Sequence, residues 1–183
     1  MARTPAVGGN ALIAAIIEGG FGIGWIEWGT ASLSATAWTA VRVLGAIIGL
    51  VIIARAIRLR RANPGPAEPS MFAARGYRLV VAAEVIALVA GSIVLIATNL
   101  AEYQIGWVAF VVGVHFVAFG KQFAARYYVL GGALIVAAIA GLVVGLAGGG
   151  VAVTAAVTGL AAGVCMFVAA VQLLLRQGAV QPA

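Results

Sequence analysis

The chain contains no aspartate, one histidine and one cysteine, and only 9% of its 183 residues are charged. Soluble globular domains carry roughly 25% charged residues, so this composition excludes a soluble domain. A disordered chain would be rich in charge and poor in apolar side chains, and it is excluded because 64% of the residues are hydrophobic. The single cysteine, Cys165, excludes any internal disulfide bond.

The shortage of His, Cys and Asp residues also excludes most metal and cofactor sites. A zinc or haem site needs two or more His or Cys ligands, and the chain has one of each. Without aspartate there is no acidic pair to hold the magnesium–diphosphate group of an ionisation-type prenyl enzyme. The glycine run 148–150 has no lysine beside it, so we expect a turn there rather than a phosphate-binding loop. We therefore expect neither a metal nor a cofactor.

Long apolar stretches are abundant, and the mean hydropathy is +1.14. A helix that crosses a bilayer needs about 20 mostly apolar residues. The sequence offers six such segments: 7–28, 35–57, 78–99, 103–122, 126–147 and 151–174. Backbone groups in hydrocarbon must be hydrogen-bonded within the protein, and no proline falls inside these segments. We therefore expect an all-α, polytopic membrane helical bundle with six transmembrane helices in a single domain.

The positions of lysine and arginine predict the orientation of these spans. With the N-terminus in the cytoplasm, ten of the eleven basic residues lie at the cytoplasmic face, and only Arg42 lies inside a span. The net charge of +6 therefore follows from topology, and we expect no nucleic-acid partner. The basic run 55–61 is also suited to anionic headgroups. We expect a multi-pass protein of the inner or plasma membrane with both termini in the cytoplasm.

Glycines four residues apart recur in the predicted spans. Such spacing allows helices to approach closely in membranes, so we expect these pairs to form packing faces. The pairs are Gly20/Gly24, Gly45/Gly49, Gly141/Gly145 and Gly159/Gly163.

The last two spans carry no charge from 128 to 175, and we expect this hairpin to pack or seal the bundle.

Charged groups at bilayer depth cost several kcal/mol unless they are paired or solvated, so each is a functional candidate. At 1.5 Å per residue, Glu18, Glu27 and Arg42 lie in the outer half, where Arg42 is expected to pair with one of the acids. Glu84 and His115 share a depth on adjacent antiparallel spans. A carboxyl group alone in hydrocarbon stays protonated, whereas one beside an arginine is held ionised.

The acids and the histidine within the predicted spans are suited to donating and accepting protons. The candidate catalytic residues are Glu18, Glu27, Glu84 and His115. The alternative is that they form buried pairs that fix the helix register and have no chemical role.

Large aromatic residues gather in the outer third of the predicted bundle. They have two interpretations: an interfacial belt, or the lining of a cavity that stabilises a cation by about 0.5–2 kcal/mol per desolvated ring. Position alone favours the belt, whereas shared helical faces favour the cavity, since Trp25 follows Glu18 by two turns and Trp38 precedes Arg42 by one. The substrate-binding candidates are then Trp25, Trp28, Trp38, Arg42, Tyr103, Trp107 and Phe119.

The segment Gly24-Trp25-Ile26-Glu27-Trp28-Gly29 places an acid between two tryptophans. In this motif and in its general character, the chain resembles the small bacterial membrane-bound terpene cyclases of terpenoid-indole and related pathways. Those proteins likewise have a few helices, no Asp-rich motif, and acids near tryptophans. The resemblance implies metal-independent, proton-initiated cyclisation of a farnesyl-type or indole-linked isoprenoid, with a glutamate as general acid. Because the chain has no aspartate as second acid, Glu18, Glu27 or Glu84 would have to serve.

Two other functions stay open at the level of sequence. A proton-coupled transporter for a small molecule could exchange a proton at Glu18 or Glu84, with His115 setting the working pH. A structural subunit could use its glycine faces to bind a larger partner. The expected partners of the enzyme or transporter are a small molecule, hydrophobic in the case of the enzyme, and the lipid bilayer. The sequence also leaves a homo-oligomer open.

Overall fold

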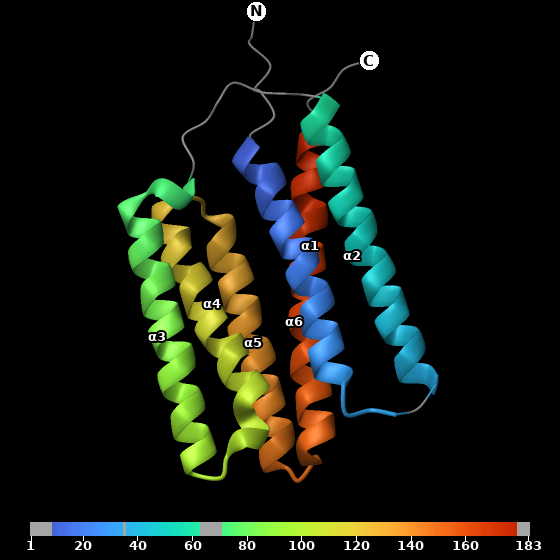
Figure 1. Ribbon diagram of the computed structural model, residues 1–183, viewed down its shortest axis with the longest axis vertical. Helices are drawn as coiled ribbons and strands as arrows, with labels where there is room; N and C mark the ends of the chain where they lie inside the picture. The colour runs from blue at the N-terminus through green and yellow to red at the C-terminus, as the bar shows by residue number, and fades with distance from the viewer. Residues whose placement is uncertain (1–8, 35, 63–70, 179–183) are drawn as a thin grey trace, which may run out of the picture.

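The computed structural model describes residues 9–34, 36–62 and 71–178, and all regular structure in these ranges is helical (Figure 1). The six long helices are α1 (Gly9–Thr30), α2 (Thr36–Ala62), α3 (Arg75–Ala97), α4 (Gln104–Gln122), α5 (Arg126–Leu146) and α6 (Gly150–Gly178). The short 3₁₀ helices η1 (Met71–Ala73) and η2 (Ala101–Tyr103) precede α3 and α4. Each long helix has the length and apolar composition needed to cross a membrane. The predicted all-α class is therefore confirmed for the described part of the chain.

The helix boundaries agree with the predicted spans to within a few residues, except at two ends. Both α2 and α6 run past the predicted ends at 57 and 174 into the basic segments that follow. Pro64, Pro66 and Pro69, which we expect to break the helix between the second and third spans, lie outside the described residues. The expected turn at 148–150 is confirmed, because Gly148 and Gly150 have φ angles of 84° and 70°. This left-handed region is readily accessible only to glycine.

The central element of the bundle is α6. It packs against α1 and α5 along most of its length and also contacts α2 and α4. One buried cluster joins α4, α5 and α6 and includes Leu134 and Met166, and a second joins α1, α2 and α6 and includes Ala15 and Phe167. Helix α6, which is uncharged up to residue 175, thus does more than seal one side of the bundle, because both cores depend on it.

In contrast, α3 is peripheral. It packs mainly against α4, and none of its residues is buried. Figure 1 shows α3, α4 and α5 together on one side of α6, with α1 and α2 on the other. Large apolar side chains cover the outside of the bundle, as shown by exposed fractions of 76% for Val129, 73% for Leu146 and 68% for Ile86. An apolar exterior of this extent is typical of surfaces that meet lipid or a protein partner.

The backbones of α1 and α6 approach each other closely. A Cβ atom at Gly159 would overlap the backbone of Trp25 and Gly29, so both glycines are needed for this approach. The prediction for Gly20 and Gly24 is wrong, because a Cβ at either position would meet open space. The glycines of α1 that face α2 and α6 are instead Gly19, Gly22 and Gly29.

Candidate functional site

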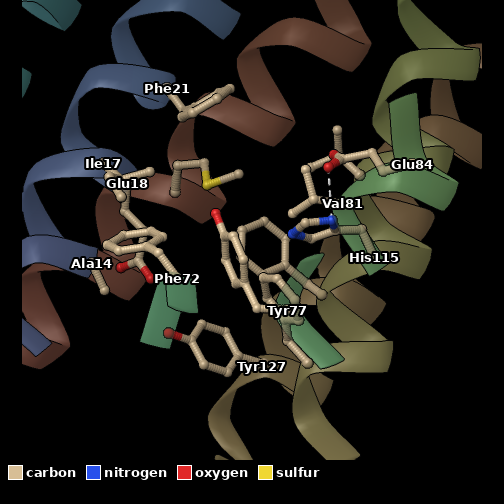
Figure 2. Close-up of a pocket in the computed structure, with 14 residues that line it drawn as sticks. Ala14, Ile17, Glu18, Phe21, Phe72, Tyr77, Val81, Glu84, His115 and Tyr127 are labelled. Atoms are coloured by element: carbon tan, nitrogen blue, oxygen red, sulfur yellow. Dashed lines mark ion pairs between the residues drawn. The ribbon is translucent and has the colours of Figure 1, made fainter. Parts of the chain in front are cut away.

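A cavity of about 170 Å³ lies between α1 and α3 and is lined by every long helix except α2 (Figure 2). Direct packing between α1 and α3 is slight or absent among the described residues, and the cavity occupies part of the space between them. Its polar groups come from Glu18, Glu84, His115 and two tyrosines. Aromatic rings form much of the remaining wall: Phe21, Phe72, Tyr77, Phe116, Phe119 and Tyr127.

The wall on the α1 side carries Glu18, whose exposed fraction is 2%. Nη1 of Arg126 donates a hydrogen bond to Oε1 of Glu18 at 3.0 Å, and Nη2 of Arg126 donates to the Tyr127 hydroxyl at 2.6 Å. The guanidinium carbon also lies 4.1 Å from the centre of the Tyr127 ring. Within the described structure Oε2 of Glu18 accepts no hydrogen bond. Glu18 is therefore paired through one oxygen with one cation and has an unused oxygen beside the cavity.

The prediction that Arg42 pairs with Glu18 or Glu27 was wrong. Arg42 contacts neither Glu18 nor Glu27; its Nε donates to Oγ1 of Thr30 at 2.9 Å and its Nη2 donates to the carbonyl oxygens of Thr30 and Leu33. These carbonyls lie at the C-terminal end of α1, where backbone acceptors lack helical partners and a cation is favourable. Arg42 therefore caps α1 and takes no part in the cavity.

Arg126 reaches Glu18 because α1 is displaced along the bundle axis relative to α5. Figure 1 shows α1, α2 and α6 extending beyond the end of the bundle at which α3 and α5 begin. The middle of α1 consequently lies level with the first turn of α5. Depths counted from the sequence assume that all spans begin in one plane, and this assumption assigned Arg126 only to the membrane surface.

The opposite wall carries Glu84 and His115, and their predicted juxtaposition is confirmed. Oε2 of Glu84 on α3 lies 2.7 Å from Nδ1 of His115 on α4. The exposed fractions of these side chains are 16% and 10%. Figure 2 shows the other ring nitrogen of His115, Nε2, on the cavity side of the ring. A proton held by this pair can therefore be presented to a molecule in the cavity.

Contacts further along α3 and α4 fix the register of this pair. The indole of Trp107 lies in the space left by Gly91, and its Nε1 donates to the carbonyl oxygen of Ala87 at 3.2 Å. The Gln104 side chain donates to the hydroxyl of Ser92. Because Ala87, Gly91 and Ser92 lie one to two turns beyond Glu84, these contacts hold Glu84 opposite His115.

The rings around His115 form a continuous cluster. The centre of the Phe119 ring lies 4.1 Å from that of His115, and Tyr77 stacks on Phe119 with centres 5.2 Å apart. Phe116 stacks on Tyr127 with centres 5.7 Å apart, which connects this cluster to the Arg126 side. Figure 2 shows Glu18 and the Glu84–His115 pair on opposite sides of the cavity, with Tyr77 between them. Phe119 is the one predicted substrate-binding residue that lines this cavity.

No tryptophan lines the cavity, so its predicted tryptophan lining was wrong. Trp25 is buried in the core among α4, α5 and α6 and stacks on Trp28, whose exposed fraction is 44%. Trp38 is half-buried on α2. Trp107 and Tyr103 line a separate apolar pocket of about 210 Å³.

Glu27 is exposed and also lies outside the cavity lining, although Trp25 and Trp28 flank it in the sequence. Trp25 points into the core because α1 packs on α6, and this leaves Glu27 on another face of the helix. The acid between two tryptophans therefore does not form a site with the cavity.

Sequence reasoning missed Arg126 and the phenylalanines and tyrosines from four separate segments. Arg126-Tyr127 offered a signal, since a basic residue followed by an aromatic one begins a span that is otherwise uncharged to 175. The described residues contain no group of three or more His, Cys, Asp or Glu side chains able to hold a metal ion.

Comparison with protein-family models, curated proteins and solved structures finds no match for this chain. The site has to be interpreted from its own residues. It combines two acid groups, each with a cationic or protonatable partner, with an aromatic wall. Such an arrangement can bind an apolar molecule and can exchange a proton with it.

Proposed function

We propose that the chain is a multi-pass protein of the plasma or inner membrane with both termini in the cytoplasm. The six apolar helices support insertion. One end of the bundle is basic, because five helix termini there carry Arg61, Arg75, Lys121, Arg126 and Arg176. The positive-inside rule assigns this end to the cytoplasm.

We further propose that the protein is a membrane enzyme that protonates a lipid-soluble isoprenoid and isomerises or cyclises it through a carbocation. One observation carries this proposal: the Glu84–His115 pair borders a cavity between α1 and α3 that is lined by six aromatic residues. We propose that a substrate already dissolved in the bilayer enters between these two helices. The proposal agrees with the chemistry that the resemblance to membrane-bound terpene cyclases implies.

In the proposed reaction, protonated His115 donates a proton from Nε2 to a double-bond carbon or an epoxide oxygen of the substrate. Glu84 stabilises the charged imidazole through Nδ1. The electron pair of a second double bond closes the ring, and the ring faces and the Glu18 carboxylate stabilise the cation. Loss of a proton from a neighbouring carbon to His115 restores the pair. Atoms and electrons then balance as an isomerisation, without an oxidant or reductant.

The volume of the cavity limits what it holds. An apolar cavity of about 150 Å³ accommodates a benzene molecule, so about 170 Å³ holds one ring-sized end of an isoprenoid. The rest of the chain would lie between α1 and α3, where direct packing is slight or absent among the described residues. The proposed substrate is thus a linear isoprenoid whose reacting end enters the cavity and whose tail remains in lipid.

The test uses membranes that contain the full chain, supplied with farnesol and its terminal epoxide. Product analysis by gas chromatography and mass spectrometry should show cyclic isomers of unchanged mass. Glu84→Gln and His115→Gln should each reduce product formation by about 100-fold or more, the usual effect of removing a general acid. The matched control is Glu102→Gln in η2, outside the cavity, and it should retain full activity. Equal product from all four proteins, or no isomer from the unmodified protein, would contradict the proposal.

Proton-coupled transport is the second candidate, and the two acid pairs on opposite sides of one cavity favour it. In this case Glu18 and Glu84 would exchange protons as a small cation passes between them. Liposomes that contain the purified protein and a pH-sensitive dye would then show proton movement when tetraethylammonium or another small cation is added. Glu84→Gln should abolish this signal. A dye response equal to that of protein-free liposomes would exclude the transport of the cations tested.

A further inference from the structure

A second concave feature lies on the outside of the bundle, between α5 and α6. It is a groove of about 260 Å³, and the cavity residues do not contribute to it. Its walls are apolar along most of their length, with Val129 and Ala133 on α5 and Val164 and Val168 on α6. Two arginines, Arg126 and Arg176, also line it.

The arginines lie at the same end of the groove. Arg126 is the first residue of α5 and Arg176 is in the last turn of α6, and these helices are antiparallel neighbours. Along α6 the groove runs from Val164 to Arg176, which corresponds to about 18 Å at 1.5 Å per residue. The hydrocarbon core of a bilayer is about 30 Å thick, so the groove extends through about one leaflet.

The charges in the groove have one sign. No carboxylate lines it, and Arg176 is exposed and forms no ion pair with a described residue. Gln172, one turn before Arg176, adds an amide. Two guanidinium groups and an amide at the membrane surface, above an apolar channel one leaflet deep, complement a phosphate group attached to an acyl chain.

We propose that this groove binds one anionic phospholipid, with its phosphate between Arg126 and Arg176 and one acyl chain along Val164 and Val168. This proposal depends on membrane insertion and not on the chemistry of the cavity. Arg126 also holds Glu18, so the bound phosphate and the cavity carboxylate share one cation. Occupation of the groove is thereby linked to the electrostatics of the cavity wall.

The test is native mass spectrometry of the full chain in detergent with equal amounts of phosphatidylglycerol and phosphatidylcholine. The unmodified protein should retain phosphatidylglycerol preferentially. Arg176→Gln leaves the Glu18–Arg126 pair intact and should weaken retention about fivefold, the usual contribution of one basic residue near an anionic lipid surface. The matched control is Arg78→Gln on α3, an exposed arginine at the same end of the bundle but outside the groove.

A second pair of variants separates a lipid from a free phosphate ion. Val168→Trp fills the apolar part of the groove without changing charge and should also reduce retention of phosphatidylglycerol. Val136→Trp, an exposed position of α5 outside the groove, should not. Three outcomes would overturn the proposal. They are equal retention of the two lipids by the unmodified protein, a loss of phosphatidylglycerol in Arg78→Gln equal to that in Arg176→Gln, and displacement of phosphatidylglycerol by about 10 mM inorganic phosphate.

Discussion

The two side walls of the cavity are built differently. The α1 wall belongs to the core of the bundle, since Ala15 and Glu18 are almost completely buried and α1 packs closely on α6. The α3 wall has no buried residue, and α3 packs mainly against α4. Each wall carries one acid, but Glu18 is fixed by an arginine from α5 whereas Glu84 contacts a histidine on the neighbouring helix. The same residue type is therefore paired with a guanidinium group in one wall and with an imidazole in the other.

This difference predicts that Arg126→Met lowers the free energy of unfolding more than any other substitution considered below. The substitution leaves the Glu18 carboxylate, with an exposed fraction of 2%, without its cation. Removal of one partner from a buried ion pair typically costs about 3–5 kcal/mol. We expect a loss near the lower value in the free energy of unfolding in detergent, because Glu18 can take up a proton.

The double variant Glu18→Gln/Arg126→Met provides the control for this prediction. Both charges are absent from it, so much of the lost stability should return. If Arg126→Met alone unfolds like the unmodified protein, Glu18 is not held in the way described.

A second prediction compares the glycine contacts of the two walls. At Gly159 an added Cβ would overlap backbone atoms of Trp25 and Gly29, which cannot move independently of α1. At Gly91 it would overlap only the Trp107 side chain. Overpacking costs about 1–3 kcal/mol, so Gly159→Ala should fall near the upper value and Gly91→Ala near the lower one.

Thermal unfolding in detergent would measure both variants. Gly20→Ala is the matched control, because a Cβ there meets open space, and its unfolding temperature should not change. Equal losses at Gly159 and Gly91 would show that α3 is held as firmly as α1.

The same contrast explains which features could be predicted from the sequence. Glu84 and His115 lie on helices joined by a short turn, so counting residues outward from that turn gives their relative depth. Glu18 and Arg126 lie on helices distant in sequence, and the displacement of α1 along the axis depends on its packing against α6. The axial position of one helix against a distant one is a tertiary property that spacing alone does not contain.

The direction in which a helix face points raises a similar difficulty. Helix α1 has small residues on several faces, and the pair Gly20/Gly24 has the same spacing as the packing pair Gly159/Gly163 but faces outward. Trp25 likewise shares a face with Glu18 by count but enters the core instead of the cavity. The helices themselves were predictable because apolar length decides them, whereas the orientation of each helix is decided by its neighbours.

A smaller effect is expected from Trp107→Phe, which removes the hydrogen bond to the Ala87 carbonyl oxygen. One such bond contributes about 0.5–1.5 kcal/mol. Because α3 has few other contacts, this loss should appear as faster hydrogen exchange of amides 75–97, while amides of α6 exchange as before. The control is Trp28→Phe on α1, where the ring is exposed. In this variant the amide exchange of α3 and α6 should not change. Faster exchange throughout the bundle would mean that α3 is not an independent unit.

The smallest change in stability is expected for Glu84→Gln. The side chain borders the cavity with an exposed fraction of 16%, and the glutamine amide keeps an oxygen at the position that Oε2 occupies near Nδ1 of His115. We therefore expect a change below about 1 kcal/mol in the free energy of unfolding, the usual limit for partly exposed pairs. The loss should be clearly smaller than that of Arg126→Met measured in the same detergent. A loss as large as that one would mean that Glu84 is a structural anion like Glu18, and the proton-donating role of the α3 wall would have to be abandoned.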